Sequence, residues 1–220
     1  MIDDERLAKM NDHLSLVLKA NETTNLTRIS SFEEGRLLHI EDSLSALDEV
    51  NEAPAGDLVD MGSGAGFPGI PLALASERHT TLVEARKKKA HIVQSIVSDL
   101  GLDELVSVQD TRIEEHAQEA SGMYAVATAR ALAKLSVLLE LAAPLLMKNG
   151  LLICYKAHID DDELAHALGL LDIFGFRLKS NRQFLLSDEQ THRRIVCFEK
   201  VKNSKVSLPR HVGYAQKRPF

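Results

Sequence analysis

The sequence has little that would tie it to a membrane or to a disulfide-stabilised fold. It contains no run of about 18 apolar residues, so we expect no membrane-spanning helix. Residues 1–5 are acidic and lack the basic and apolar regions of a secretion signal. The only cysteines are Cys154 and Cys197, and each lies within an apolar run. We therefore expect two buried free thiols and a cytoplasmic protein.

Several catalytic and metal-binding patterns are also missing. His, Cys, Asp and Glu do not cluster at metal-ligand spacing, so we expect no metal site. Neither cysteine follows a proline, which argues against a cysteine nucleophile of the kind that attacks C5 of a pyrimidine. The sequence also lacks an Asn/Asp-Pro-Pro-aromatic tetrad, the motif typical of enzymes that methylate the amino group of adenine.

The chain lacks the overall basic charge that is typical of nucleic-acid-binding domains. Lys and Arg total 26 and Asp and Glu total 32, which gives a formal net charge of −6 at pH 7. The charge is uneven, however, because residues 200–220 carry Lys and Arg but no acid. Residues 86–89 form a second basic cluster, either a solvated helix face or a phosphate contact. Such patches allow an acidic protein to bind a phosphate backbone locally.

The first 55 residues predict a helical extension. Apolar residues recur at helical spacing over residues 3–20. Ser31 and Glu34 match a capping box, which predicts a second helical region that runs to about Val50. Residues 54–56, Pro-Ala-Gly, interrupt that pattern.

From residue 56 the pattern changes to alternating strands and helices, which predicts an α/β fold with a mostly parallel sheet. The predicted strands are 57–61, 80–84, 105–109, 124–129 and 151–156, and the predicted helices are 70–76, 87–100, 135–147 and 161–174. Segments 176–186 and 193–201 follow without a helix between them and predict an antiparallel hairpin. We expect a seven-stranded Rossmann-like sheet of the class I methyltransferase type over residues 56–201, then a basic C-terminal tail over residues 202–220.

A glycine-rich turn between the first predicted strand and its helix is the strongest local signal. It contains Gly62, Gly64 and Gly66, whose lack of a Cβ allows a tight turn and a close approach of a ligand. Read from Gly62, the pattern favours S-adenosylmethionine as the cofactor. The alternative is a dinucleotide, because residues 64–69 formally match G-x-G-x-x-G. Pro68 argues against it, since proline lacks the amide that a pyrophosphate needs at a helix N-terminus.

Glu84 ends the next predicted strand, about twenty residues beyond the loop. A carboxylate at this position accepts hydrogen bonds from both ribose hydroxyls of a nucleoside. S-adenosylmethionine and NAD share that ribose, so Glu84 supports nucleoside binding without choosing the cofactor. The alternative is a solvated acid at the end of a strand.

Residues 60–72 resemble the signature of the RsmG (GidB) family, whose members methylate N7 of a guanine in 16S ribosomal RNA of the small subunit. Shorter matches in the same order extend the resemblance over nearly the whole chain. They are residues 25–27, 39–44, 112–115 and 128–131, Lys156, and Pro209, Arg210, Gly213 and 217–219 in the tail.

The resemblance implies which residues contact the methyl donor. The matching positions are Gly62, Phe67, Ile113, Glu114 and Arg130. Guanine N7 has an exposed lone pair and needs no strong base, so we expect the protein to supply proximity and alignment.

Arg130 is the candidate catalytic residue. It would bind the donor carboxylate, an RNA phosphate or guanine O6, and a structural salt bridge is the alternative. His39 and Asp42 lie three positions apart and either face the site or are structural.

Other functions remain open from the sequence. A methyltransferase that acts on a small molecule or a protein is one alternative, and a dinucleotide-binding oxidoreductase is another. The acid-free basic tail favours RNA over a small molecule. We expect a monomer that binds S-adenosylmethionine and the small ribosomal subunit, with Lys202, Lys205, Arg210 and Arg218 of the tail on RNA phosphates.

Overall fold

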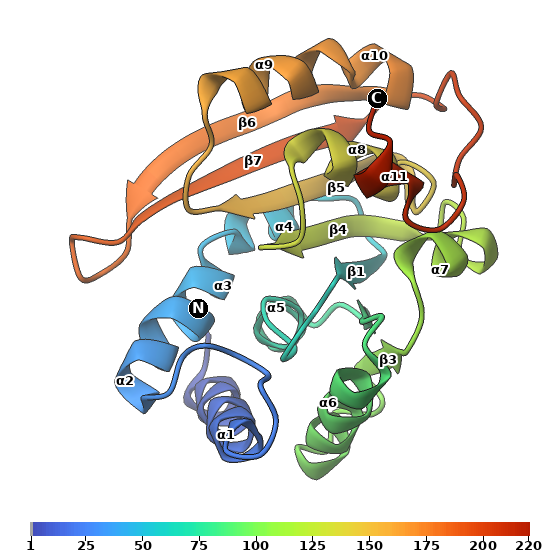
Figure 1. Ribbon diagram of the computed structural model, residues 1–220. Coiled ribbons are helices and arrows are strands. Elements are labelled where there is room, and N and C mark those ends of the chain that lie inside the picture. The colour runs from blue at the N-terminus through green and yellow to red at the C-terminus, as the bar shows by residue number, and fades with distance from the viewer. Residues whose placement is uncertain (1) are drawn as a thin grey trace.

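Seven strands form one sheet in the order β3-β2-β1-β4-β5-β7-β6 in the computed structural model, which describes residues 2–220 (Figure 1). The strands are β1 (Asp57–Met61), β2 (Thr80–Val83), β3 (Val106–Gln109), β4 (Tyr124–Arg130), β5 (Leu146–Lys156), β6 (Phe176–Leu185) and β7 (His192–Lys200). All neighbours pair in parallel except β7, which runs antiparallel to both β5 and β6. The predicted Rossmann-like sheet with a C-terminal antiparallel hairpin is therefore confirmed.

Helices cover both faces of this sheet. They are α1 (Asp4–Asn21), α2 (Phe32–Gly35), the π-helix η1 (Arg36–Glu41), α3 (Asp42–Leu44), α4 (Leu47–Glu52), α5 (Gly69–Ser76), α6 (Lys87–Asp99), α7 (Ile113–Glu119), α8 (Leu135–Ala142), α9 (Asp161–Gly169), α10 (Leu171–Phe174) and α11 (Tyr214–Lys217). Successive strand residues pack on opposite faces. In β1, Leu58 packs with residues of α4 and α5, whereas Val59 packs with residues of α7 and α8.

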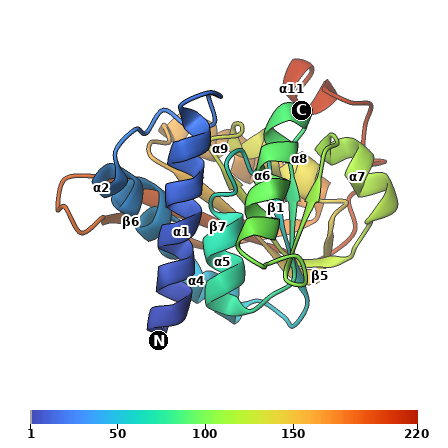
Figure 2. The same cartoon turned by 90° about the horizontal axis from the view of Figure 1, so that it is seen from below.

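The N-terminal helices pack against the sheet domain. The Asp3 side chain caps α1 by accepting a hydrogen bond from the amide of Arg6. Figure 2 shows α1 beside α5 and α6 on one side of the molecule. Met10 and Leu14 of α1 are fully buried in the same apolar cluster as Val93 of α6. The helix predicted over residues 3–20 is therefore confirmed.

The second N-terminal helical region is broken rather than continuous to Val50. Its first turn is capped as predicted, because Ser31 Oγ accepts a bond from the amide of Glu34 at 3.2 Å. A π-helical segment follows, and the helix breaks between α3 and α4. The hydroxyls of Ser43 and Ser45 donate to the carbonyls of His39 and Asp42, and such back-bonding bends helices.

Beyond the first strand, the structure shortens one predicted helix and adds one that was not predicted. The helix predicted over residues 135–147 ends at Ala142, because Pro144 disfavours helical backbone before it and residues 146–147 already belong to β5. Helix α7 was not predicted. It is short, and the Glu115 carboxylate caps it by accepting bonds from the Arg112 amide and the Thr111 hydroxyl.

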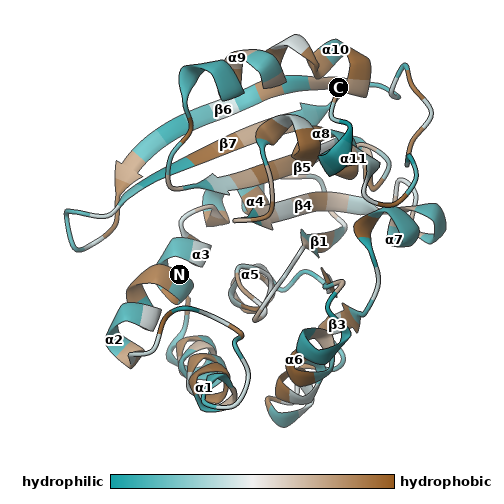
Figure 3. Ribbon diagram, in the orientation of Figure 1, coloured by the Kyte–Doolittle hydropathy of each residue, from teal (hydrophilic) through white to brown (hydrophobic). Residues whose placement is uncertain are grey.

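The sheet interior is apolar and its far edge is polar. Strand β5 is largely hydrophobic along its length, whereas the edge strand β6 is largely hydrophilic (Figure 3). Cys154 of β5 and Cys197 of β7 are buried free thiols, as predicted. Over residues 2–220, no helix combines the length and the hydrophobicity needed to span a bilayer.

Candidate functional site

The glycine loop leaves β1 in a conformation that suits glycine alone. Gly62 has a φ of 72°, and a Cβ built on it would lie 2.7 Å from Cδ1 of Leu132. Its amide donates to the Val83 carbonyl at 2.8 Å, which joins the loop to the end of β2. Any larger residue at this position would therefore displace Leu132 and strain the backbone.

Asp60 holds this loop to the sheet. Its side chain is fully buried; Oδ2 accepts a bond from the Gly69 amide at 3.0 Å, and Oδ1 accepts one from the Thr128 hydroxyl at 2.9 Å. Burial raises the pKa of Asp60 to about 6, although both hydrogen bonds act in the opposite direction. The sequence pattern included Asp60 but did not reveal this role, since Thr128 lies 68 positions away.

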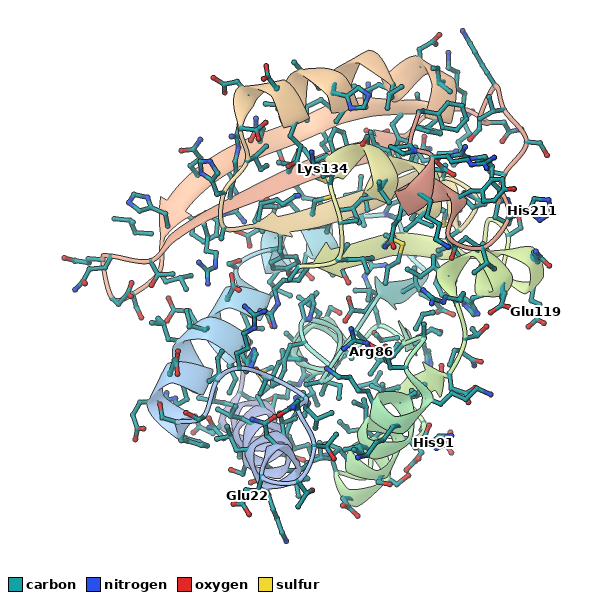
Figure 4. All side chains as sticks on the ribbon, viewed as in Figure 1. Glu22, Arg86, His91, Glu119, Lys134 and His211 are labelled. Carbon is teal, nitrogen blue, oxygen red and sulfur yellow. The ribbon has the colours of Figure 1, made fainter. Side chains whose placement is uncertain are left out.

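A cleft of about 430 Å³ opens at the carboxyl ends of β1, β2, β3 and β4. Ligands bind at this edge in open α/β sheets. Its lining residues come from the strand ends, α7, α8 and the C-terminal tail: Gly62, Val83, Glu84, Ala85, Arg86, Thr111, Arg112, Ile113, Glu114, Ala131, Leu132, Leu141, Gly213 and Gln216. Figure 4 shows Arg86 at the beginning of α6. We refer to this space as the donor cleft.

Glu84 lies on the floor of the donor cleft and is only 8% exposed, so it is not a solvated acid. Its Oε2 accepts a bond from the Gly64 amide at 3.1 Å, and its Oε1 accepts one from the Arg86 amide at 2.7 Å. These bonds fix the carboxylate beside the glycine loop. A carboxylate oxygen can accept further hydrogen bonds, so the position fits a ribose diol.

Ile113 and Glu114, at the beginning of α7, form the wall beyond β3. Both are largely buried and both line the donor cleft. Glu114 Oε1 accepts a bond from the amide of Gly213 at 2.7 Å. The C-terminal tail therefore reaches this wall, which the sequence did not indicate.

A second cavity of about 390 Å³ adjoins the donor cleft. Its lining residues come from the N-terminal helices, the ends of β4 and β5, and β7: Ile29, Leu38, His39, Asp42, Ala129, Arg130, Ala131, Ala133, Leu138, Tyr155, Lys156, Ala157, His158 and Arg193. Ala131 lines both spaces and has a φ of 54°. This left-handed conformation costs an alanine on the order of 1 kcal/mol, so the junction of the two spaces is held by its surroundings. We refer to the second space as the acceptor cavity.

Arg130 lies in the acceptor cavity, not in the donor cleft. Its Nη1 lies 2.9 Å from Asp42 Oδ2, and Arg193 Nε lies 3.0 Å from Asp42 Oδ1. Asp42 is buried, while the side chains of Arg130 and Arg193 are 14% and 16% exposed. Two arginines that share one carboxylate leave a net positive charge facing the cavity. Arg193 was not singled out from the sequence.

His39 is neutral and orients Arg130. Burial, followed by the charge of Arg130 and the neighbouring His13, lowers the pKa of His39 to about 3. Its Nδ1 lies 3.3 Å from Arg130 Nη2 and accepts that proton, so Nε2 carries hydrogen and donates to Thr27 Oγ1 at 2.9 Å. His39 and Asp42 therefore both face the site.

Phe67 does not line the donor cleft. Its ring is buried between His13 and His39, with centroid distances of 4.2 Å and 4.4 Å. Gly66 lies beneath the same stack, since a Cβ on it would be 3.1 Å from His13 Nε2. The resemblance implied a direct donor contact for Phe67; the structure places its ring in this histidine stack, and the contact itself stays a prediction.

Most tail cations are paired within the chain. Lys202 and Lys205 both bind Asp172. Arg210 forms a two-pronged pair with the buried Glu140, with N–O distances of 2.7 and 2.6 Å. Each of these three side chains has a partner that lies far away in sequence, and their contact with RNA phosphates stays a prediction. Lys156 lines the acceptor cavity, and its Nζ donates to Glu163 at 2.6 Å and to the Ala133 carbonyl.

Comparisons with known proteins give one consistent result. A family model described as rRNA small subunit methyltransferase G (GidB) matches residues 6–194. The protein named ribosomal RNA small subunit methyltransferase G from Exiguobacterium sp. is 33% identical over 222 residues, which cover 100% of this chain and 93% of the relative. The protein of the same name from Bacillus subtilis is 31% identical over 222 residues, covering 100% of this chain and 92% of the relative.

Solved structures support the fold. Cofactor-bound Rv0187 from MTB superposes with a TM-score of 0.62 at 17% identity, covering 91% of this chain and 92% of that one. Geranyl diphosphate methyltransferase in complex with SAM superposes with a TM-score of 0.53 at 13% identity, covering 72% of this chain and 84% of that one. At these identities the likeness concerns the fold alone.

Proposed function

The chain belongs to the rRNA small subunit methyltransferase G family, and we propose that it transfers a methyl group from S-adenosylmethionine to N7 of a guanine in 16S rRNA. The observation that carries this proposal is the junction at Ala131 between the donor cleft and the cationic acceptor cavity. A cofactor in the first space and a base in the second would meet at this residue.

The residues of the donor cleft fit S-adenosylmethionine. Glu84 offers its carboxylate to a ribose, Gly62 leaves the backbone open, and Ile113 offers an apolar surface to a base. When bound, this cofactor supplies an electrophilic methyl group. Of the residues we assign to cofactor binding, Gly62, Glu84, Ile113 and Glu114 line the cleft, Gly64 binds Glu84 through its amide, and Gly66 and Phe67 pack against His13.

The acceptor cavity fits a guanine that is held for attack by N7. The lone pair of N7 is free at neutral pH, and His39, with its pKa lowered to about 3, is neutral there and already bound to Arg130 and Thr27. Arg130 and Arg193 are placed to bind guanine O6 or a flanking phosphate. Alignment of this kind is worth roughly 7–11 kcal/mol of the barrier.

The alternatives fit the structure less well. A dinucleotide needs free amides at the beginning of α5, but Pro68 has none and the Gly69 amide is bound to Asp60. A neutral small molecule would not need two arginines in the acceptor cavity. Both spaces are built from one chain, so we propose that a monomer acts on the small subunit, in the cytoplasm.

The test uses small subunits from cells that lack this gene. Purified protein and labelled S-adenosylmethionine should introduce one N7-methylguanine into 16S rRNA, located by borohydride–aniline cleavage and primer extension. Calorimetry should show binding of S-adenosylmethionine and none of NAD. Donor binding without methylation of any ribosomal substrate would favour a small-molecule or protein acceptor.

A further inference from the structure

The C-terminal tail forms part of the donor cleft. Gly213 and Gln216 line it together with Gly62 and Glu84. Residues of the tail are built into the apolar core around α8, where Ala215 is only 2% exposed. Arg210 fixes the segment further through its two bonds to the buried Glu140, and its Nη2 also donates to the Arg218 carbonyl at 2.9 Å. The tail is thus an ordered wall rather than a loose basic extension.

The position of this wall identifies the part of the cofactor that it faces. Glu84, at the end of β2, marks the place of the ribose. The sheet order β3-β2-β1-β4 puts Gly62 and Ala131 on one side of that place and Ile113 and Glu114 on the other. Because the methyl group must point toward the acceptor cavity at Ala131, the base must lie at the opposite end, against Glu114 and the tail.

The hydrogen bond from the Gly213 amide occupies only one of the two oxygens of the Glu114 carboxylate. Oε1 accepts the Gly213 amide, and among residues 2–220 the structure gives Oε2 no donor. Oε2 is therefore available to accept a bond from an exocyclic amino group. A Gln side chain presents one donor and one acceptor, which match the N6 amino group and a ring nitrogen of adenine.

We propose, building on the proposed function, that residues 210–217 close the base end of the donor cleft and that Gln216 together with Glu114 selects adenine. In this arrangement Gly213 is a positioning residue, because its amide fixes the Glu114 carboxylate. Gln216 contacts the cofactor itself. The segment serves the methyl donor, a role distinct from RNA binding.

The test compares two ligands that differ only in the base. S-adenosylhomocysteine carries adenine, and S-inosylhomocysteine has oxygen in place of the amino group. Calorimetry on the full chain should show that the wild type prefers the adenine ligand. Gln216→Ala, a change at an exposed position, should weaken S-adenosylhomocysteine binding by roughly 5- to 12-fold and reduce the preference by a similar factor. The KM for the methyl donor should rise, with kcat at saturating donor within about 2-fold.

A matched control lies on the same tail. The double variant Lys202→Ala, Lys205→Ala removes two cations that bind Asp172 outside the cleft, so it should bind both ligands as the wild type does. A second variant, Glu140→Leu with Arg210→Met, removes the ion pair that fixes the tail without leaving a buried charge. It should lower the affinity for S-adenosylhomocysteine while the circular dichroism spectrum stays that of the wild type. Wild-type affinity and selectivity in Gln216→Ala would overturn this inference alone. A wild-type protein that binds neither ligand would overturn the proposed function with it.

Discussion

Nη1 of Arg130 lies 2.9 Å from Oδ2 of the buried Asp42, so the arginine at the end of β4 is held in place by the N-terminal helices. Arg193 binds the other oxygen of the same carboxylate. A charge that is oriented in advance costs little to organise when the substrate binds, which is the usual basis of electrostatic catalysis. Asp42 thus connects the N-terminal extension to the proposed chemistry.

Arg130→Ala should lose most methyl transfer. Removal of one charge-assisted contact typically costs about 2–3 kcal/mol, or roughly 30- to 150-fold in single-turnover rate on small subunits. Arg130→Lys should recover little, because an ammonium does not present a planar fork. Since Arg130 lines the acceptor cavity, donor affinity measured by calorimetry should change by less than about 3-fold.

The control is the double variant Arg130→Ala, Asp42→Asn. In Arg130→Ala alone, the buried carboxylate of Asp42 keeps only Arg193 as a partner, and the second change removes that carboxylate. A double variant that regains stability but not rate would separate the two effects. If the affinity for the methyl donor falls as much as the rate, Arg130 binds the cofactor instead.

Arg193→Ala should weaken substrate binding more than it slows methyl transfer within the bound complex. Its guanidinium faces the acceptor cavity, so its loss should raise KM for small subunits by about 5- to 30-fold. If Arg193 contacts a phosphate, the salt dependence of RNA binding should flatten by roughly 0.7–0.9 in log–log slope. Arg194→Ala is the matched control, because Arg194 binds Asn181 at the sheet edge. Equal effects of the two changes would argue against a cavity-specific role.

Asp60→Asn should change how stability depends on pH. The folded protein raises the pKa of Asp60 from 3.8 to about 6, so between these values the native state holds a proton that the unfolded chain has released. The contribution of Asp60 to the free energy of unfolding therefore falls as pH rises through that window, in total by about 3 kcal/mol. The asparagine variant should gain stability relative to the wild type between pH 4.5 and 7.5, as measured by urea unfolding.

The geometry supports an asparagine at this position, because its amide oxygen can accept the Gly69 bond while its NH2 group donates to Thr128. Asp60→Ala leaves both partners without an acceptor and should destabilise the fold at every pH. A constant difference between Asp60→Asn and the wild type from pH 4.5 to 7.5 would contradict the raised pKa.

His13→Gln should have the opposite pH dependence. Burial lowers the pKa of His13 to about 4, so as pH falls from 6.5 the unfolded chain takes up a proton and the native state does not. Stability is therefore lost as pH falls from 6.5 toward 4, by on the order of 3 kcal/mol. Gln retains a donor for the Ala65 carbonyl without titrating, so the variant should resist acid better than the wild type in urea unfolding at pH 4.5. Parallel pH curves would show that His13 does not titrate in this way.

Local patterns predicted the sheet because each strand is an apolar run that ends at a turn or a helix. They failed where apolar residues continue past a helix end, as at Leu145 and Leu146, where β5 begins. Helix α7 has few residues and a side-chain cap, so its periodicity is too short to recognise. The end of the second predicted strand pointed to Glu84 and the family resemblance pointed to the Ile113–Glu114 pair, and all three residues line the same cleft as Gly62.

Contacts between distant segments could not be predicted in the same way. Arg210 pairs with Glu140, 70 positions away, and Lys202 pairs with Asp172, 30 positions away. In the sequence these cations form an acid-free run, and nothing near them shows where their partners lie. Phe67 illustrates the same limit, because an apolar residue in a loop does not indicate whether it faces the ligand or the helices behind it.

The position of Gly213 and Gln216 in the donor cleft also bears on how the protein is made. Chains emerge from the ribosome from the N-terminus onward, and His13, which bonds the glycine loop from behind, emerges early. The wall of the cleft that Gly213 and Gln216 form is synthesised only after all seven strands. A nascent chain can therefore assemble its sheet and dock its first helix while the cleft remains open on one side. A translation product that stops after β7 would keep the strands of the fold and lack one wall of the cleft.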